Sequence, residues 1–212
     1  MLKPLVTLTC LLALAVPAIA DPASQTATAT ATPANAASIA DQEAAAGKVL
    51  FLGPRLTFET DHGSFTLVTF PQEAPQTVAQ IVKLARGGFY DGLAFHRIVP
   101  GFVAQVGDPA TRHYPPSDPH VGNGGSGHPV PPEYDGQSVQ FLTGTVGLAR
   151  GQAPNSGDSQ FFVTLAPEPN LNDRYTIFGQ VIRGMDTVRA LKVGDRIRHV
   201  SVTEPIKASP SP

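Results

Sequence analysis

Residues 95–109 read FHRIVPGFVAQVGDP and place two polar side chains, Arg97 and Gln105, within an otherwise apolar stretch. Successive side chains of a β-strand point to opposite faces, so Val103 and Gln105 lie together while Ala104 and Val106 point the other way. A strand here therefore presents one purely apolar face and one face that carries an apolar and a polar group side by side.

A second stretch with this pattern is SQFFVTL, residues 159–165. In a strand, Gln160 and Phe162 share one face, and Phe161 and Val163 share the opposite face. The two stretches offer matching mixed faces, which indicates a surface that combines apolar and amide groups.

Arg97 is the unusual member of these mixed faces. A buried arginine is ordinarily one half of an internal ion pair. Between Glu73 and Gly107, however, Asp91 is the only acidic residue, so a partner close in sequence is scarce. Taken singly, the glutamines fit ordinary backbone hydrogen bonding, and Phe102 and Phe162 fit an ordinary core. Only the combination indicates a functional site.

The hydrophobic pattern predicts short strands and two helices between residues 48 and 206. RLTFETDHGSFTLVTF, residues 55–70, alternates around Asp61-His62-Gly63 as the two strands of a hairpin do. APQTVAQIVKLARGG, residues 74–88, has apolar residues at helical spacing, and residues 185–191 predict a second helix. Further strands are predicted at 94–98, 103–106, 144–149, 161–165, 176–181 and 196–203.

These elements favour an all-β fold, a closed barrel with helices at its ends, over the alternative of a β-sandwich. The chain has 20 glycines and 21 prolines, which gather at turns and tails. Residues 111–136, TRHYPPSDPHVGNGGSGHPVPPEYDG, are too long for a tight turn and too rich in Gly and Pro for regular structure. Loops of this length within compact domains are often functional.

Both ends of the chain read as appendages to this domain. MLKPLVTLTCLLALAVPAIA, residues 1–20, has the basic start, apolar run and Ala18-Ile19-Ala20 ending of an export signal, and it is too short for a stable membrane span. Residues 21–47 are rich in Ala and Thr and predict a disordered tether, with at most a helical turn near residues 41–46. Residues 207–212 predict a flexible tail.

The amino-acid composition excludes several classes of function. At 212 residues and 42% hydrophobic, the chain suits one domain, residues 48–206, plus its appendages. Cleavage after Ala20 removes Cys10, the only cysteine, which excludes thiol nucleophiles and thiolate metal sites from the mature protein. The net charge of −2 and the lack of a basic stripe argue against nucleic acid as a partner. An exported protein, periplasmic or at the cell surface, is expected.

Three histidines, His113, His120 and His128, fall within the long loop. A metal site is one interpretation of such a group. No acidic or cysteine ligand accompanies them at a recognisable spacing, so solvated histidines are the preferred interpretation. No metal and no cofactor is therefore expected.

FHRIVPGFVAQVGDP and GTVGLARGQAPNSGDSQFFVTL, residues 144–165, resemble the two motifs of cyclophilin-type peptidyl-prolyl isomerases, and NLNDRYTIFGQV, residues 170–181, continues the match. The resemblance runs from about residue 55 to residue 202 and is closest to the bacterial exported branch. It implies a closed eight-stranded antiparallel barrel capped by two α-helices. It also implies non-covalent acceleration of rotation about X-Pro bonds in exported proteins.

The resemblance assigns roles residue by residue. Arg97 is implied as the catalytic donor to the prolyl nitrogen, and Gln105 is implied to steady Arg97 and to contact the substrate. The other implied substrate-binding residues are Phe102, Val103, Phe162 and Leu171 around the proline ring, and Arg150, Gly151, Gln152 and Gln160 along the peptide groove, with Tyr175 where many relatives have histidine.

Two positions depart from the eukaryotic pattern. Asn170 stands where many eukaryotic cyclophilins have tryptophan, so weak binding of the inhibitor cyclosporin is expected. Val103 is smaller than the methionine common there, so a roomier pocket is expected.

The alternative function is a proline-binding or chaperone module with incidental isomerase activity. In either case the expected partners are unfolded, proline-containing exported proteins, and the expected state is a monomer.

Overall fold

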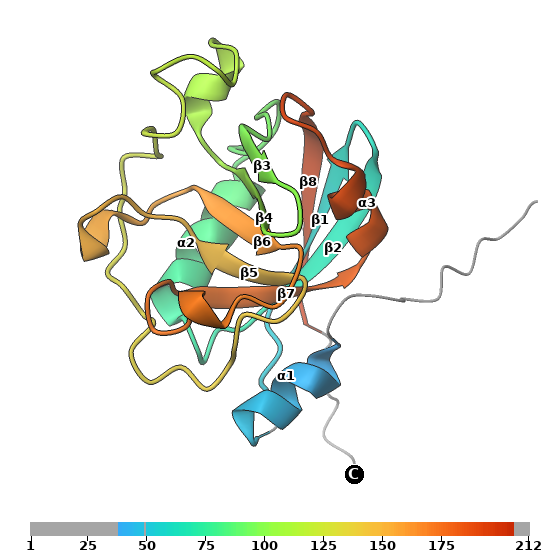
Figure 1. Ribbon diagram of the computed structural model, residues 1–212, viewed down its shortest axis with the longest axis vertical. Helices are drawn as coiled ribbons and strands as arrows, with labels where there is room; N and C mark the ends of the chain where they lie inside the picture. Colours follow the sequence, from blue (N-terminus) through green and yellow to red (C-terminus); the bar gives the residue numbers. More distant parts are fainter. Residues whose placement is uncertain (1–37, 49, 206–212) are drawn as a thin grey trace, which may run out of the picture. The chain divides into compact units, whose positions relative to one another are not determined.

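The structure, a computed structural model, describes residues 38–48 and 50–205. Eight strands of this described part form one antiparallel sheet in the order β3-β4-β6-β5-β7-β2-β1-β8 (Figure 1). The strands are β1 (Arg55–Thr60), β2 (Gly63–Thr69), β3 (Arg97–Val99), β4 (Val103–Val106), β5 (Thr145–Leu148), β6 (Phe161–Thr164), β7 (Ile177–Arg183) and β8 (Ile197–Thr203).

The hairpin predicted from residues 55–70 is confirmed. Strands β1 and β2 pair antiparallel from Arg55↔Val68 to Thr60↔Gly63. Gly63 has a φ of 109°, which a residue with a side chain rarely adopts, so glycine suits this end of the turn. On the inner face, the rings of Phe58 and Phe65 stack 4.9 Å apart and hold the two strands in register.

The eight antiparallel strands predicted above are confirmed, but closure of the barrel is not shown. The sheet curls into a half-barrel whose edge strands are β3 and β8. In the described part of the chain, these edges meet at the isolated bridge Ala94↔Arg196 and through backbone hydrogen bonds between residues 92–95 and 194–197. Strands β3 and β8 themselves do not pair, so this contact does not extend into a ladder. A single curled sheet also rules out the β-sandwich alternative.

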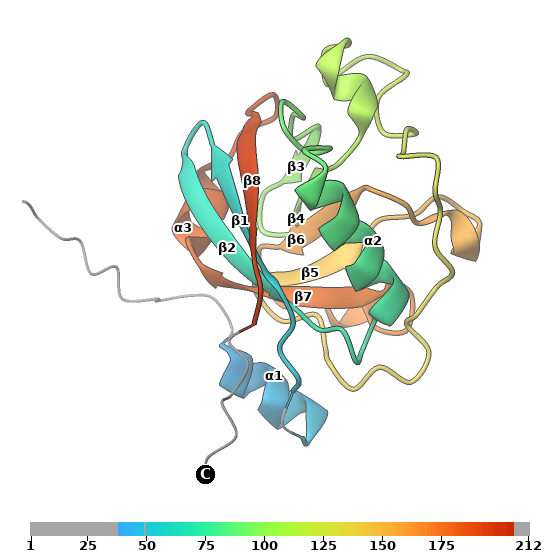
Figure 2. The same cartoon turned by 180° about the vertical axis from the view of Figure 1, so that it is seen from behind.

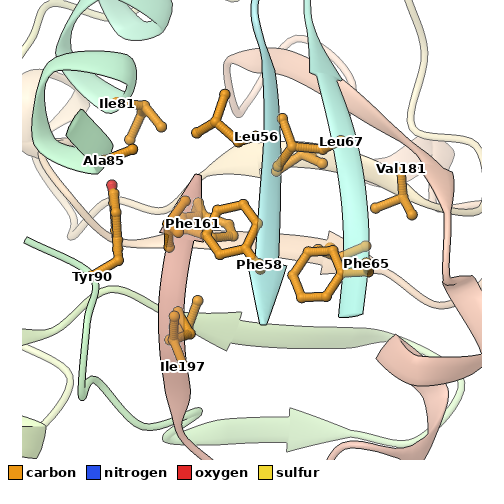
Figure 3. Close-up of a cluster of buried hydrophobic side chains, with 14 of the residues drawn as sticks. Leu56, Phe58, Phe65, Leu67, Ile81, Ala85, Tyr90, Phe161, Val181 and Ile197 are labelled. Carbon is orange, nitrogen blue, oxygen red and sulfur yellow. The ribbon is translucent and has the colours of Figure 1, made fainter. Parts of the chain in front are cut away.

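The inner face of the sheet carries the main core. Ala104, Val106, Phe161 and Val163 all belong to it, which confirms the alternation predicted for β4 and β6. Figure 3 shows Phe58, Phe65 and Phe161 packed together at its centre. Burial of this apolar surface is the main term that stabilises the fold.

Two helices cover this core, as predicted. Helix α2 (Pro75–Arg86) buries Val78, Ile81, Val82 and Ala85 on one face, with proline at its first position. Helix α3 (Met185–Ala190) adds Met185 and Val188 to the same cluster. Figure 2 shows α2 lying across the curled sheet, with α3 beside β2.

A third helix, α1 (Ile39–Ala46), lies where at most a helical turn was predicted. The Ser38 side chain caps its N-terminus by accepting from the backbone N–H of Asp41, and the Asp41 carboxylate accepts from the backbone N–H of Ser38. Gly47 ends the helix at a φ of 64°. The part of the predicted tether from Ser38 to Gly47 is thus ordered rather than disordered. Residues 1–37 and 206–212, which contain the predicted export signal, the rest of the tether and the tail, lie outside the described residues.

The long segment between β4 and β5 has little regular structure, as predicted. It holds the 3-10 turn η1 (Pro109–Arg112), and two further turns, η2 (Pro154–Ser156) and η3 (Pro169–Leu171), follow later in the chain. Among the described residues, no helix has the length and apolar character needed to cross a bilayer.

Candidate active site

The outer faces of β4 and β6 carry the predicted mixed pattern into a second apolar cluster. Val103 and Phe162 are buried here, and Phe102, Leu171 and Tyr175 pack against them. These five residues line a cavity of about 210 Å³ together with Arg97, Gln105, Ala149 and Arg150. The cavity is large enough for a proline ring and is built mainly from apolar side chains.

Arg97 lies at the rim of this cavity. It sits on β3 directly opposite Gln105 of β4, so strand pairing brings both side chains to the same face. Its guanidinium carbon lies 5.6 Å from the centre of the Phe102 ring, within cation–π range. Within the described residues, the structure gives the Arg97 side chain no hydrogen bond and no ion pair with an acid, and the side chain is exposed.

Gln105 and Gln160 form a short relay beside Arg97. The Gln105 amide donates to Gln160 Oε1 at 3.0 Å, and Gln160 Nε2 donates to the carbonyls of Gly122 at 3.0 Å and Gly124 at 2.8 Å. Gln105 was predicted to steady Arg97 and to contact the substrate. The structure gives its amide to Gln160, so Gln105 ties the site to the long loop.

Arg150 and Tyr175 close another side of the cavity. The Arg150 guanidinium carbon lies 5.0 Å from the centre of the Tyr175 ring, and its Nε donates to the carbonyl of Arg174 at 3.1 Å. The Tyr175 ring in turn packs edge-on against Phe162 at 5.5 Å. Arg150 is therefore held by backbone carbonyls and an aromatic face, which leaves it positioned along the groove.

A second cavity of about 180 Å³ adjoins the first and shares Gln105, Ala149 and Arg150 with it. Gly151 and Gln160, two of the residues predicted to border a peptide groove, line this cavity. Gln152 lines neither of these two cavities, and its carbonyl accepts from Arg150 at 3.4 Å. The two cavities together form one groove with an apolar and a polar half.

The sequence motifs missed several residues of the polar half. These are Gly122, Asn123, Gly124, Ala149, Ser156 and Asp158. Three of them come from the long loop, and the glycine-rich run of that loop was the available signal. Ala149 borders both cavities, but a small apolar residue carries no signal of its own.

Two carboxylates, one of them buried, hold the long loop against the sheet. Asp108 is fully buried and accepts hydrogen bonds from the backbone of Gly122 and Gly124. A methyl group added at Gly124 would lie 2.2 Å from Asp108 Oδ1, so this close approach requires glycine. Asp158 accepts likewise from Gly127 and His128. The loop is thereby fixed as one wall of the groove.

His96 precedes Arg97 and lies close to Asp108 and Gln160. Both of its ring nitrogens are buried and have no hydrogen-bond partner in the described part of the chain. Burial lowers the pKa of His96 below its ordinary value of 6.5, because a buried imidazolium is poorly solvated. A neutral imidazole suits packing more than proton transfer.

The three loop histidines are not gathered into a metal-binding group. His120 pairs with Asp118 at 2.7 Å and stacks on Tyr114, and His113 and His128 are exposed. Across residues 38–48 and 50–205, no group of three or more His, Cys, Asp or Glu side chains is arranged to hold a metal ion.

A curled antiparallel sheet with a cavity lined mostly by apolar residues, an exposed guanidinium at its rim and an adjoining polar groove defines an all-β protein with a candidate site on the outer face of its sheet. The family model described as cyclophilin type peptidyl-prolyl cis-trans isomerase/CLD matches residues 55–209. The chain therefore belongs to the cyclophilin-type peptidyl-prolyl cis-trans isomerase family, and its substrates are proline-containing peptides.

Named relatives agree with this membership. A probable peptidyl-prolyl cis-trans isomerase of Brucella abortus (strain 2308) is 44% identical over 148 residues, which cover 68% of this chain and 74% of the relative. Peptidyl-prolyl cis-trans isomerase B of Bacillus subtilis (strain 168) is 38% identical over 133 residues, 63% of this chain and 86% of the relative. The enzyme class predicted from the motifs is thus confirmed.

The fold has solved counterparts. A crystal structure of a Cryptosporidium parvum cyclophilin type peptidyl-prolyl cis-trans isomerase superimposes with a TM-score of 0.62 at 24% identity, covering 73% of this chain and 99% of that one. At this identity the likeness supports the fold alone.

Proposed function

We propose that Arg97 catalyses the isomerisation by donating a hydrogen bond to the prolyl nitrogen of a substrate whose ring occupies the 210 Å³ cavity. The observation that carries this proposal is an arginine without an acidic partner among the described residues, placed at the rim of an apolar cavity. A guanidinium paired with an internal acid would have its donors already occupied.

The chemistry requires no bond to break. Resonance makes the peptide bond stiff, with a rotation barrier of about 18–20 kcal/mol. Twisting the bond removes the nitrogen lone pair from conjugation, so the nitrogen becomes a better hydrogen-bond acceptor in the twisted state than in either planar state. A donor aimed at it lowers the barrier, because it stabilises the transition state more than the ground states. A guanidinium remains protonated at any physiological pH and suits this role.

Binding of the proline ring in the cavity supplies the rest of the rate acceleration. Phe102, Val103, Phe162 and Leu171 hold the ring side of the bond, while the carbonyl side turns in the open groove. A hydrogen bond to a charged group contributes roughly 1.5–3 kcal/mol, or about one to two powers of ten in rate. Arginine alone therefore does not account for enzymatic acceleration, and binding in the cavity is part of catalysis.

Replacing Arg97 tests the proposal. For Arg97→Ala we expect kcat/KM for a prolyl peptide to fall by roughly ten- to a hundredfold or more, with the thermal unfolding midpoint nearly unchanged because the side chain is exposed. Arg198→Ala, on the outer end of β8 and paired with Asp61, serves as the matched surface control. A coupled or NMR exchange assay measures the rate. Wild-type kcat/KM in Arg97→Ala would refute the mechanism.

The same variant separates catalysis from mere binding. In the alternative function, a proline-binding or chaperone module, Arg97→Ala loses affinity for unfolded chains in proportion to its loss of isomerase rate. In the proposed function, peptide affinity measured by titration is largely retained while turnover is lost.

We further propose that the enzyme is exported, to the periplasm or the cell surface, and acts there as a monomer on unfolded exported proteins. The support is the sequence of residues 1–20, with Lys3, its apolar run and Ala18-Ile19-Ala20. Expression of the full chain in a bacterial host tests this. We expect a secreted or periplasmic product whose N-terminal residue is Asp21 and which elutes at monomer size. A full-length product confined to the cytoplasm contradicts the proposal.

A further inference from the structure

Helix α1 docks on the domain through one buried polar side chain, that of Gln42. Its amide is fully buried. Nε2 donates to the carbonyl of Gln140 at 2.9 Å and to Thr145 Oγ1 at 2.8 Å, and Oε1 accepts from the backbone N–H of Gln140 at 3.2 Å. The side-chain amide thus satisfies both backbone groups of Gln140, as a neighbouring strand would.

The rest of α1 contributes little specificity to this docking. Its sequence IADQEAAA has one large aliphatic side chain, Ile39, which is only partly buried. A helix dominated by alanine has little apolar surface to bury, so the hydrogen bonds of Gln42 fix where it sits. Loss of these bonds removes an amide donor from Thr145, which is fully buried, and that is costly.

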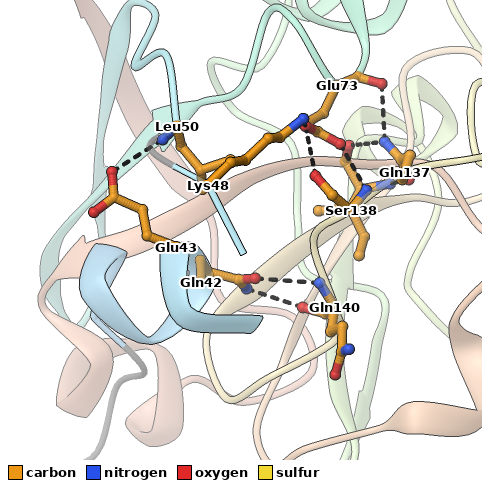
Figure 4. A network of polar contacts seen from close by, with 9 residues as sticks. Gln42, Glu43, Lys48, Leu50, Glu73, Gln137, Ser138 and Gln140 are labelled. Carbon is orange, nitrogen blue, oxygen red and sulfur yellow. Dashed lines mark hydrogen bonds and ion pairs between the residues drawn. The ribbon is translucent and has the colours of Figure 1, made fainter. Parts of the chain in front are cut away.

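A second set of contacts links the end of α1 to residues 137–141 through Glu73. Lys48 pairs with Glu73 at 2.7 Å, and Glu73 accepts from both the backbone and the hydroxyl of Ser138, at 3.0 and 2.9 Å. Glu43 meanwhile accepts from the backbone of Leu50 at 3.0 Å and folds the connection back on the helix. Figure 4 shows Gln42 bonded to Gln140, and Lys48 and Ser138 both bonded to Glu73.

The stretch held by these ties backs the substrate cavity. Val139 lies between the two tied residues and Phe141 follows them, and both are buried in the outer cluster with Phe162. The Phe141 ring stacks on Phe162 at 5.6 Å. Gly147 lies beneath both rings, and a methyl group there would come within 2.5 Å of Phe162 and 2.8 Å of Phe141. Phe141 and Gly147 therefore both pack against the Phe162 ring.

The stretch also lines a smaller cavity next to the site. Gln137, Ser138, Val139 and Gln140 line this cavity of about 110 Å³ together with Tyr175, which is itself a wall of the larger cavity. Two aromatic residues of the site, Phe162 and Tyr175, thus lie beside residues 137–141.

We propose that α1 is a brace for the substrate pocket and that Gln42 is its positioning residue. When docked, α1 holds Phe141 behind Phe162 and so fixes the shape of the cavity that receives the proline ring. When undocked, residues 137–141 relax and the cavity binds its substrate less well. This inference rests on the proposed function, because it takes Phe162 as a wall of the proline-binding cavity.

The test compares Gln42→Ala with Ala44→Gln in the otherwise intact chain. Ala44 is an exposed position on the same helix, so its replacement controls for changes in helix propensity. For Gln42→Ala we expect KM for a prolyl peptide to rise roughly threefold or more while kcat changes less than about twofold, since a reshaped pocket weakens binding and leaves Arg97 in place. Ala44→Gln is expected to match the wild type in both constants.

Native-state hydrogen exchange supplies a readout that is independent of activity. In Gln42→Ala the amide of Gln140 should exchange at least roughly tenfold faster, while the amides of β1 and β2 keep their wild-type rates. Gln42→Glu is a second variant of nearly the same size. It keeps an acceptor for the Gln140 N–H but has no donor for Thr145 or the Gln140 carbonyl, so it should behave as Gln42→Ala does.

Each outcome decides the proposal. A raised KM together with faster exchange at Gln140 supports the brace. Unchanged KM, with or without faster exchange, overturns it, and so does unchanged exchange at Gln140. Arg97→Ala, measured in parallel, keeps the two proposals apart. If Arg97→Ala is active and Gln42→Ala has a raised KM, only the arginine mechanism is refuted. If Arg97→Ala is inactive and Gln42→Ala has the wild-type KM, only the brace is refuted.

Discussion

Arg97 and Gln105 illustrate how neighbouring residues acquire different roles. Gln105 was predicted to share a face with Val103, and strand pairing places Arg97 directly opposite Gln105. Gln105 nevertheless bonds to Gln160, because an amide is both donor and acceptor and finds a complementary amide across the strand pair. Arg97, a donor only, keeps its guanidinium beside the Phe102 ring. This difference leaves the cation available to a substrate.

The first prediction at the residue scale concerns His96 and the pH dependence of stability. Burial lowers its pKa below 6.5, with Asp108 opposing the shift and Arg97 adding to it. The unfolded chain then binds a proton at a higher pH than the folded chain, so stability is full above about pH 6.5 and falls as the pH drops toward the folded-state pKa. Over that window we expect wild-type stability to fall by up to about 1.4 kcal/mol per pH unit relative to His96→Leu.

Urea unfolding of the two proteins between pH 5 and pH 8 measures this effect. The five other histidines are present in both proteins, so their contributions cancel in the difference. Parallel stability curves below pH 6.5 would show that His96 titrates normally in the folded state.

At the scale of elements, helix α2 shows a cap supplied from far away in the sequence. Its N-cap residue is Ala74, which makes no side-chain cap hydrogen bond. The Glu133 carboxylate fills this role from the long loop, and it accepts from the backbone of Gln76 at 2.9 Å and Thr77 at 2.8 Å. A carboxylate at a helix N-terminus also interacts favourably with the helix dipole.

Removing this carboxylate tests its contribution. We expect Glu133→Ala to lower the free energy of unfolding by about 1–2 kcal/mol, because two backbone donors and the Thr77 hydroxyl lose their acceptor. Asp135→Ala, an exposed acid in the same loop, is the control and should change stability by less than about 0.5 kcal/mol. Equal stabilities of the two variants in chemical denaturation would contradict this role.

Local pattern predicted most elements and few of their boundaries. The hairpin, α2 and β4 lie where alternation and helical spacing placed them, because each buries one continuous face. The predicted strand at 94–98 was less accurate: regular pairing begins only at Arg97, while residues 94 and 95 contact the segment before β8. Helix α1 was underestimated, since its docking depends on Gln42 bonding to Gln140, a partner 98 residues away.

For the whole molecule, the inner core and the outer site are separate layers of one sheet. Phe58 of β1 contacts the rings of Phe65, Tyr90 and Phe161 and joins distant segments inside the half-barrel (Figure 3). Phe162, the next residue after Phe161, faces the substrate cavity. The sheet therefore couples the layers only through its backbone.

This separation leads to a prediction about Phe58. Phe58→Ala should lower the free energy of unfolding by about 3–5 kcal/mol, a large share of the total of a typical domain. KM of the folded fraction should remain within about twofold of the wild type, since the inner cluster does not touch the cavity. Denaturant titration and steady-state kinetics at low temperature measure both quantities. An increase in KM as large as that of a cavity variant would show that the two layers are coupled.

The sequence by itself determined which side chains of β4 and β6 share a face, most of the segments that are strands or helices, and which family the motifs belong to. These properties follow from alternation, helical spacing and residue chemistry, all of which act over a few residues. The pairing of Gln105 with Gln160, the glycine loop held by Asp108, the cap from Glu133 and the docking of α1 by Gln42 were decided only by the tertiary structure. Each is a contact between residues far apart in the chain, and a linear pattern carries no record of which distant polar groups fill one another's hydrogen bonds.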